Sequence, residues 1–394
     1  MMRSEKGVLV KAVLVVCFVL CLVCVAGGKP AGAAETIKIG HVCSITGWAG
    51  MLGSPQRDAM LAMVDDVNKR GGILGKQVEA FIEDDQSNPT TAVIAATKLV
   101  RDKKVNVLVG TTLSDCAMAV ASLAEQEQVP YIVTSPVVLP FKKWVFPVGP
   151  GDVKMAAHTV EMAVNTLGAK KIALFHDTAL YGMQGAKIFN RDVGKYGASI
   201  VIEQSYDVKD LDVAPQLTKI KAAKPDLMVV YSTGAPCAVI AKNYKQLGMT
   251  TQVLGSGGLG GPDFLKIAGG IADELNWVIA VLKISIAESL PSSDSYRKTV
   301  YDPALKIFAD KYGPGKPLNV FHVSPMDAFV MAEDAIKAAG SDDRAKIRDA
   351  MEKVKFMGLL GYVAPDATDH QGGNIDTSTL ALFKNGQFVP YSKK

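Results

Sequence analysis

Six short segments rich in glycine, serine and threonine carry the groups in this sequence that are best suited to binding chemistry. Each follows a short apolar stretch that is predicted to be a β-strand, and they begin at residues 43, 110, 134, 177, 232 and 255. Free N–H and O–H donors at the starts of helices suit an anion such as a carboxylate. Because Ser and Thr also cap ordinary helices, one such segment alone is better explained as a cap. Six of them converging on one cleft favour a binding site.

One of these segments, Gly255–Gly260, matches the G-x-G-x-x-G pattern of dinucleotide-binding proteins. That motif requires a strand–helix–strand unit of about 30 residues. Only about 16 residues separate the segment from the next predicted strand, which begins at Trp277. The spacing argues against a nucleotide, and we expect no cofactor.

The sequence contains no pattern of a catalytic or metal centre. Neither G-x-S-x-G nor H-E-x-x-H occurs, and the five histidines have no metal-ligand spacing. His41 and His176 end predicted strands and are interpreted as core or rim residues. His322 precedes Pro325 in a predicted loop, where a ligand contact is an open alternative. We therefore expect neither an enzyme nor a metalloprotein.

Residues 1–34 have the pattern of a secretory signal peptide. A start with three basic residues precedes the uncharged run Ala12–Ala26, and small residues follow up to Ala34. The run is short for a membrane span, which needs about 20 apolar residues, so a retained anchor is the less favoured alternative. We expect a mature chain that begins near Glu35 and works in the periplasm.

Charge limits the classes of partner. The net charge of the 394 residues is +4, and the predicted leader contributes four basic residues and one acidic residue to it. The mature chain is therefore almost neutral, with neither a basic stripe for nucleic acid nor a polybasic segment for a membrane surface. We expect a monomer that binds a small molecule and no nucleic acid.

Three cysteines remain in the predicted mature chain: Cys43, Cys116 and Cys237. The odd number excludes a fully paired set of disulfides. A Cys43–Cys116 bridge is one alternative, because both residues should lie near strand ends. Small, partly buried thiols are the favoured alternative.

Strands and helices alternate along the chain, and the pattern occurs twice. The first series runs from a strand at 37–42 through a helix at 56–70 to a strand at 131–133, and a second series begins after 149–151 and reaches a strand at 252–254. This alternation is typical of parallel sheets covered by helices. We predict an α/β protein with two doubly wound, Rossmann-like lobes.

The C-terminal third is less regular. It contains a predicted strand at 277–282, helices at 296–312 and 326–339, and the hairpin signal Asn385-Gly386.

We expect the chain to cross between the lobes near 150, 283 and 357, so that three crossings form a hinge. The predicted lobes are residues 35–151 with 283–356, and residues 152–282 with 357–394.

Several motifs together resemble the leucine/isoleucine/valine-type periplasmic binding proteins of ABC importers. The most specific is the segment Asp66–Lys76, and it is accompanied by Ile37–Gly40, Thr46-Gly47, Asp84-Asp85, Val109-Gly110, Val129–Ile132 and Tyr181-Gly182. The resemblance extends over nearly all of residues 35–394. It implies the fold of a type I periplasmic binding protein, whose two lobes close on one small solute and then dock on a membrane permease.

The resemblance also implies roles for individual residues. Ser114 matches the serine that binds the ligand carboxylate, and Tyr181 matches the tyrosine on the second-lobe face of the cleft. Trp48 and Leu52 fall in the first loop, which usually covers the ligand side chain. Further candidates from the expected cleft loops are Asp115, Thr134, Ser135, Val137, Val138, Thr233, Gly234 and Gly257.

One departure from the family pattern bears on the ligand. The family's amino-acid binders place a carboxylate after the strand equivalent to 252–254, where it pairs with the ligand ammonium, whereas this chain has Gly255–Gly258. An unpaired buried ammonium is costly. An aromatic or aliphatic acid is therefore an alternative to a branched-chain or apolar amino acid. Asp115 is an alternative partner for an ammonium, or a helix-start residue stabilised by the helix dipole.

These observations predict an extracytoplasmic solute-binding protein that delivers a small carboxylate-bearing solute to an ABC importer by hinge closure. The main alternative is the ligand-binding part of a sensor, which would require a separate signalling partner. An exported enzyme is the least favoured alternative.

Overall fold

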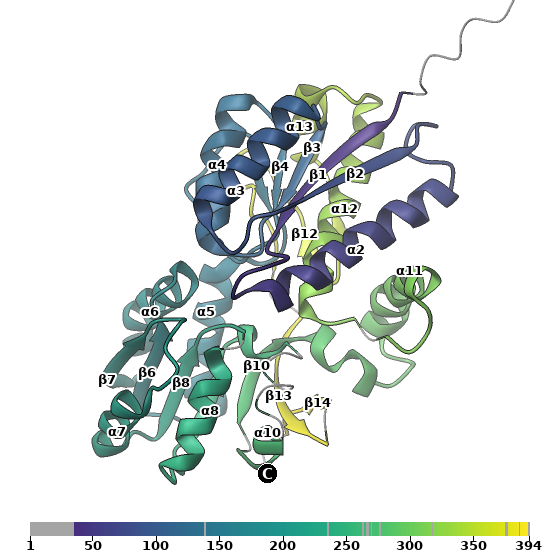
Figure 1. The fold of residues 1–394 in the computed structure, drawn as a ribbon. Helices are drawn as coiled ribbons and strands as arrows, with labels where there is room; N and C mark the ends of the chain where they lie inside the picture. The colour runs from purple at the N-terminus through teal and green to yellow at the C-terminus, as the bar shows by residue number, and fades with distance from the viewer. Residues whose placement is uncertain are drawn as a thin grey trace, which may run out of the picture. The chain divides into compact units, whose positions relative to one another are not determined.

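The computed structural model describes residues 35–392, apart from 138, 235, 262, 263, 265–267, 269, 276, 317, 375, 376 and 386. The predicted leader therefore lies outside the described residues. From Ile37 onward the chain forms one compact unit built on two main sheets (Figure 1). Among the described helices, none combines the length and the apolar character that a bilayer crossing requires.

The first sheet has five parallel strands in the order β2-β1-β3-β4-β5. The strands are β1 (Ile37–Cys43), β2 (Val78–Asp84), β3 (Val107–Gly110), β4 (Tyr131–Val133) and β5 (Val145–Pro147). The helices of this lobe are α2 (Gly50–Lys69), α3 (Pro89–Thr97), α4 (Ser114–Glu127), α11 (Asp302–Tyr312), α12 (Val320–Ala339) and α13 (Arg344–Met351). Every residue of β3, β4 and β5 is buried, as expected for parallel strands covered on both faces.

The second sheet has the order β14-β13-β10-β9-β8-β6-β7. Its strands are β6 (Lys171–Asp177), β7 (Ser199–Tyr206), β8 (Leu227–Tyr231), β9 (Gln252–Gly255), β10 (Val278–Leu282), β13 (Ser378–Lys384) and β14 (Gln387–Pro390). Its helices are α5 (Gly151–Glu161), α6 (Leu180–Asp192), α7 (Ala214–Ala223), α8 (Pro236–Gln246) and α10 (Gly270–Leu275). Strands β6 to β10 are parallel, and β13 and β14 add an antiparallel hairpin. The pairing of Lys384 with Gln387 confirms the predicted hairpin.

The parallel parts of the two sheets have the same doubly wound order. In both, the first strand in the chain lies between the second and the third: β2-β1-β3-β4-β5 and β7-β6-β8-β9-β10. This confirms the predicted fold class. In such sheets a ligand site lies beyond the carboxyl ends of the strands, where the winding reverses.

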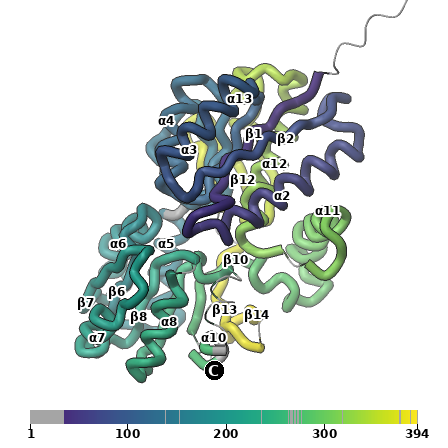
Figure 2. Tube along the Cα trace, viewed as in Figure 1, coloured from purple at the N-terminus to yellow at the C-terminus, as the bar shows by residue number. Residues whose placement is uncertain are grey.

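The chain crosses between the lobes three times. It leaves the first sheet after β5, and the next helix, α5, packs on α6. After β10 it returns to α11 and α12, which lie beside α2, and after α13 it crosses again to β13 (Figure 2). The three crossings confirm the predicted hinge topology. The exact lobe boundaries stay predictions.

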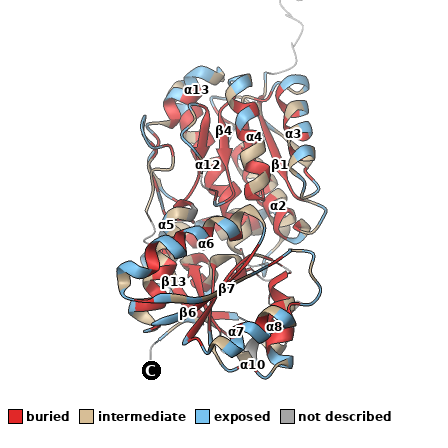
Figure 3. Cartoon of the chain, turned by 90° about the vertical axis from the view of Figure 1, so that its left-hand side faces the viewer, coloured by how far each residue is buried: buried red, intermediate tan, exposed pale blue. Residues whose placement is uncertain are grey.

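Apolar side chains fill the space between each sheet and its helices. Figure 3 shows the strands largely buried, with the exposed residues concentrated on the outer faces of the helices. Late residues such as Phe329 and Met351 share a core with Ile37 and Val107 of the first sheet. The C-terminal third therefore completes the core of the first lobe.

Helix α2 begins six residues before its predicted start, and Pro55 lies inside it. A Cβ atom on Gly53 would lie 2.0 Å from the carbonyl oxygen of Ser44. Glycine at this position lets the first turns of α2 lie against the loop that follows β1. The predicted start at Gln56 left Pro55 and these first turns outside the helix.

Helix α12 also begins earlier than predicted, at Val320, with Pro325 inside it. The Asn319 side chain accepts a hydrogen bond from the N–H of Phe321, and the Asn319 N–H donates to Nδ1 of His322 at 3.1 Å. His322 is therefore a capping residue in the first turn and not part of a loop. Burial lowers the pKa of its imidazole to about 4.

The Cys43–Cys116 bridge does not form. Cys43, Cys116 and Cys237 are all buried and free, which confirms the favoured alternative. Burial raises the pKa of each thiol well above its usual range.

Side chains from both lobes hold the third crossing at Leu359 and Leu360. The buried carboxylate of Asp327 on α12 accepts the N–H groups of Leu359 and Leu360, both at 2.8 Å. The hydroxyl of Tyr296 donates to the Leu359 carbonyl at 2.8 Å, and that of Thr377 donates to the Leu360 carbonyl at 2.6 Å. All four backbone groups are thereby satisfied, and burial raises the pKa of Asp327 to about 7.

We expect Asp327→Asn to lower the free energy of unfolding by about 1–3 kcal/mol, because an amide has one acceptor oxygen for two buried N–H donors. The substitution should also change the pH dependence of stability. The folded pKa of about 7 lies above the unfolded value near 3.9. The folded state thus holds more protons between these values, and wild-type stability should fall as the pH rises from about 4 to about 7.

Urea unfolding at several pH values between 5 and 8 measures both effects. One proton contributes at most about 1.4 kcal/mol per pH unit, and this part of the slope should be missing in Asp327→Asn. Parallel pH profiles for the two proteins would show that Asp327 is ionised throughout this range.

Candidate functional site

A cavity of about 140 Å³ lies between the two lobes at the carboxyl ends of their strands. Residues that follow β1, β3, β4 and β5 form one side of its wall, and residues that follow β6, β8 and β9 form the other. Helix α12 and the third crossing close the remainder. The position agrees with the rule for doubly wound sheets.

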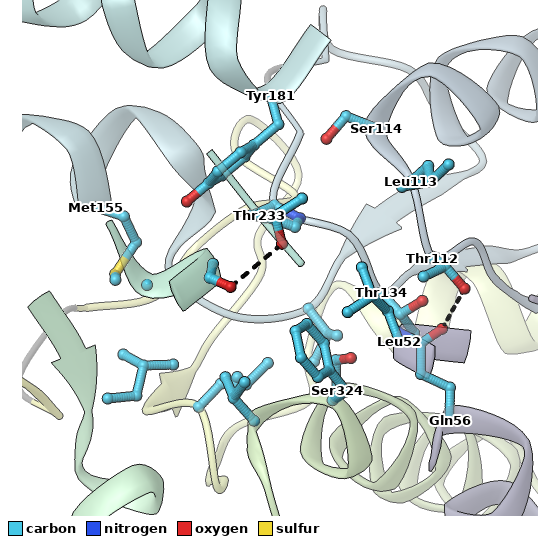
Figure 4. A pocket seen from close by; sticks show the side chains of 18 of the residues that line it. Leu52, Gln56, Thr112, Leu113, Ser114, Thr134, Met155, Tyr181, Thr233 and Ser324 are labelled. Atoms are coloured by element: carbon cyan, nitrogen blue, oxygen red, sulfur yellow. Dashed lines mark hydrogen bonds between the residues drawn. The ribbon is translucent and has the colours of Figure 1, made fainter. Parts of the chain in front are cut away.

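The polar side chains of the wall are uncharged. No acidic or basic side chain occurs among the lining residues that the structure describes. The polar members are Gln56, Thr112, Ser114, Thr134, Tyr181, Thr233 and Ser324 (Figure 4). The remaining side chains are apolar: Leu52, Leu113, Pro136, Val148, Pro150, Met155, Leu282, Val320, Phe321 and Leu360. A mostly apolar wall with a few polar groups is typical of a small-molecule site.

The N-terminus of α4 reaches the wall at Ser114. The residue before it, Leu113, is the N-cap and provides no side-chain hydrogen bond to the helix. The first turn of a helix has N–H groups without partners inside the helix, and these favour a negative charge. The hydroxyl of Ser114 and this helix start together provide donors for a carboxylate.

A hydrogen-bonded chain orders the wall on the side of the first sheet. The N–H of Ser44 donates to Oγ1 of Thr112 at 2.8 Å, and Thr112 donates to Oε1 of Gln56 at 2.7 Å. The hydroxyl of Ser44 donates to the buried carboxylate of Asp85 at 2.6 Å. Burial raises the pKa of Asp85. The loop after β1 thus holds two cavity side chains in place.

A second chain orders the wall on the side of the second sheet. The hydroxyl of Ser232 donates to the buried carboxylate of Asp177 at 2.6 Å and lies 2.6 Å from the hydroxyl of Tyr206. Asp177 also accepts the N–H of Ala179 at 3.0 Å. Burial raises the pKa of Asp177 to about 6. This chain anchors the backbone next to Thr233, which lines the cavity.

Asp115 connects the two lobes. Its Oδ1 atom accepts the N–H of Leu180, at the start of α6, at 3.2 Å. Asp115 is half-buried and is not among the described lining residues, although its neighbour Ser114 is. Asp115 therefore lies in the first turn of α4 and also accepts a hydrogen bond from the first turn of α6.

Six of the twelve predicted residues line the cavity: Leu52, Ser114, Thr134, Tyr181, Thr233 and Gly257. Leu52 lies in the first turn of α2 and not in a loop.

The other predicted residues lie outside the described lining. Trp48 is half-buried and packs against the core of the first lobe, to which Val137 belongs. Ser135 is buried, and Gly234 has a φ of +72° and lies beside Leu52. Val138 lies outside the described residues.

Sequence reasoning missed several residues of the wall, including Gln56, Met155, Phe321, Ser324 and Leu360. Gln56 follows Leu52 by one helical turn, so extending the helix across Pro55 would have found it. The sequence carries no comparable signal for Phe321, Ser324 or Leu360. They reach the cavity only because α12 and the third crossing return to it.

His41 and His176 lie in the positions of structural residues. His41 is fully buried in β1, neither ring nitrogen has a hydrogen-bond partner, and burial lowers its pKa to about 3. His176 lies at the end of β6, with Nδ1 2.8 Å from the carbonyl of Asp177. These positions confirm the interpretation as core and rim residues. Within the described part of the chain, no group of His, Cys, Asp and Glu side chains is arranged to hold a metal ion.

Comparison with known proteins shows what this architecture resembles. Residues 36–385 match the family described as periplasmic binding protein. A leucine-, isoleucine-, valine-, threonine- and alanine-binding protein from Pseudomonas aeruginosa is 25% identical over 339 residues, which cover 84% of this chain and 86% of the relative.

Solved structures share the fold over most of the chain. An extracellular ligand-binding receptor from Rhodopseudomonas palustris HaA2 is 28% identical with a TM-score of 0.82, covering 91% of this chain and all of the receptor. A solute-binding protein of an ABC transporter from R. palustris, solved in complex with benzoate, is 21% identical with a TM-score of 0.75, covering 91% of this chain and 96% of that protein. The fold is that of type I periplasmic binding proteins.

Proposed function

This chain belongs to the periplasmic binding protein family, and from that premise we propose that it captures a small apolar acid outside the cytoplasm and delivers it to an ABC importer. The observation that carries the proposal is the cavity wall, in which uncharged donors stand among apolar side chains. Such a wall suits a ligand with one carboxylate and an apolar body.

The carboxylate is expected at the start of α4. Ser114 provides a hydroxyl there, and the first turn of the helix has no side-chain cap. The Thr134 hydroxyl on the same wall already donates to the Thr111 carbonyl at 3.0 Å. A carboxylate that accepts several N–H and O–H bonds keeps its charge at low cost. No basic side chain is needed for this mode of binding.

The uncharged wall favours an acid without an ammonium group. An α-amino acid would bring a buried positive charge, and the described lining offers no carboxylate to pair with it. The P. aeruginosa relative is an amino-acid-binding protein, and the R. palustris solute-binding protein was solved in complex with benzoate. Because the same fold accommodates both ligand classes, the side chains of the cavity wall must determine which class binds.

The size of the cavity suits a compact body. An apolar cavity of about 150 Å³ holds one benzene ring, and the volume here is about 140 Å³. Aromatic acids with one ring and branched aliphatic acids of similar bulk are therefore the expected ligands.

Closure of the two lobes on the ligand completes the mechanism. Ligand contacts on both walls stabilise the closed arrangement relative to an open one, and the bond from Leu180 to Asp115 adds to it. The closed protein would then dock on the membrane permease. The basic and apolar start of the sequence supports export to the periplasm, and a monomer is sufficient for this cycle.

We expect acids to bind more tightly than the amino acids that differ from them only by the ammonium group. Suitable pairs are 4-methylpentanoate with leucine, and phenylacetate with phenylglycine. An unpaired buried ammonium should weaken binding at least about 100-fold, measured by calorimetry on the purified protein. Tighter binding of leucine than of 4-methylpentanoate would contradict the proposed ligand class.

We expect Ser114→Ala to weaken binding of the preferred acid by about 1–3 kcal/mol, because a buried bond to a charged group is lost. The neighbouring loop supplies a matched control in Ser135→Ala, since Ser135 is buried but outside the described lining. Calorimetry on both variants provides the test. Equal affinities for wild type and Ser114→Ala would remove Ser114 from the site.

We expect Asp115→Ala to weaken binding about fivefold, or about 1 kcal/mol, because the half-buried carboxylate no longer accepts the N–H of Leu180 in the closed arrangement. Asp310→Ala, at an exposed position of α11, is the control. The thermal midpoint should fall more with ligand than without it. An equal fall in both states would mean that the bond is present whether or not ligand is bound.

A further inference from the structure

Gln56 is a buried amide on the cavity wall. Its side chain is 2% exposed, and it lies on α2 one turn after Leu52. Its oxygen, Oε1, accepts the hydroxyl proton of Thr112 at 2.7 Å. Its nitrogen, Nε2, has no hydrogen-bond partner among the described residues. A donor on the cavity wall that has no partner in the protein is satisfied by water or by a ligand.

The hydrogen bonds of Thr112 determine which end of the amide faces the cavity. Thr112 already accepts the N–H of Ser44 at 2.8 Å, and its own proton is free to donate. With Oε1 toward Thr112, that proton has an acceptor. If the amide were rotated by 180°, Thr112 would accept a second N–H and its proton would have no acceptor among the described residues. The chain from Ser44 through Thr112 therefore directs the Gln56 NH₂ group to the cavity.

Gln56 lies apart from the expected carboxylate site. In the view of Figure 4, Ser114 is at the upper side of the cavity and Gln56 at the lower side, with Leu113 and Thr134 between them. Ser324 of α12 is also at the lower side. A ligand whose carboxylate binds at Ser114 would thus present its other end to Gln56.

We propose that Gln56 is a specificity-determining residue, whose NH₂ group donates to a neutral oxygen at the end of the ligand remote from its carboxylate. This inference rests on the proposed function and names the ligand class more closely: an apolar acid with a remote hydroxyl or carbonyl group. A hydrocarbon at this position leaves the donor unpaired, and a second carboxylate would bring an uncompensated charge into an uncharged wall. Sites that bond a polar group of their ligand reject the analogue that lacks it.

Matched acids test this proposal. Calorimetry on the purified protein would compare benzoate with 3- and 4-hydroxybenzoate, and pentanoate with 4-oxopentanoate. We expect the wild type to prefer the oxygenated member of at least one pair by about 10-fold or more. We expect Gln56→Met, which keeps the length of the side chain but has no donor, to lose this preference.

Two further variants keep the test decisive. Thr112→Val retains the shape of Thr112 but no longer orients the amide, and should reduce the preference even if Gln56→Met does not fold. Gln216→Met, on α7 outside the cavity lining, should leave the preference unchanged.

A preference that persists in Gln56→Met, or one that is absent from a wild type that binds the parent acids, overturns the proposal. Equal weakening of both members would place the carboxylate itself at Gln56 and also overturns it. If the wild type binds none of the acids, the proposed function fails.

Discussion

Buried carboxylates that accept backbone N–H groups hold the irregular segments around the cavity in place. Each lobe must interrupt its regular structure at the carboxyl ends of its strands, and buried backbone groups there need partners. Asp85 accepts the N–H of Ser87, Asp177 accepts that of Ala179, and Asp327 accepts those of Leu359 and Leu360. The shape of the cavity depends on these bonds.

The same carboxylates are not among the described lining residues, and the wall is uncharged. The carboxylates of Asp85 and Asp177 accept hydrogen bonds from the hydroxyls of Ser44 and Ser232 behind the wall. Neither acid is among the described lining residues. In the proposed binding mode the ligand carboxylate meets the Ser114 hydroxyl and the start of α4, which can donate to an anion without charge of their own. A wall of this kind discriminates against a cation by the absence of a partner, with no need for a repelling charge.

Asp115 connects the two lobes without being among the described lining residues. It follows Ser114 directly, and it accepts the first N–H of α6 while Tyr181, the next residue of α6, lines the cavity. The two lobes therefore meet by a direct hydrogen bond next to the residues expected to hold the solute.

The sequence alone determined the fold class and the strand ends at which the cavity lies. The repeated alternation of apolar strands and helices predicted two parallel sheets, and the rule for strand ends then indicated the loops that contain Thr134 and Thr233. The family resemblance singled out Ser114 and Tyr181, and all four residues line the cavity. Only the tertiary structure decided which other side chains complete the wall. Ser324 and Leu360 come from segments more than 120 residues beyond Tyr181 in the sequence, and no local pattern distinguishes a helix face turned to the cavity from one turned to the core. Burial and the direction of hydrogen bonds, as at Gln56 and Asp115, arise from packing between distant segments, which periodicity and spacing do not contain.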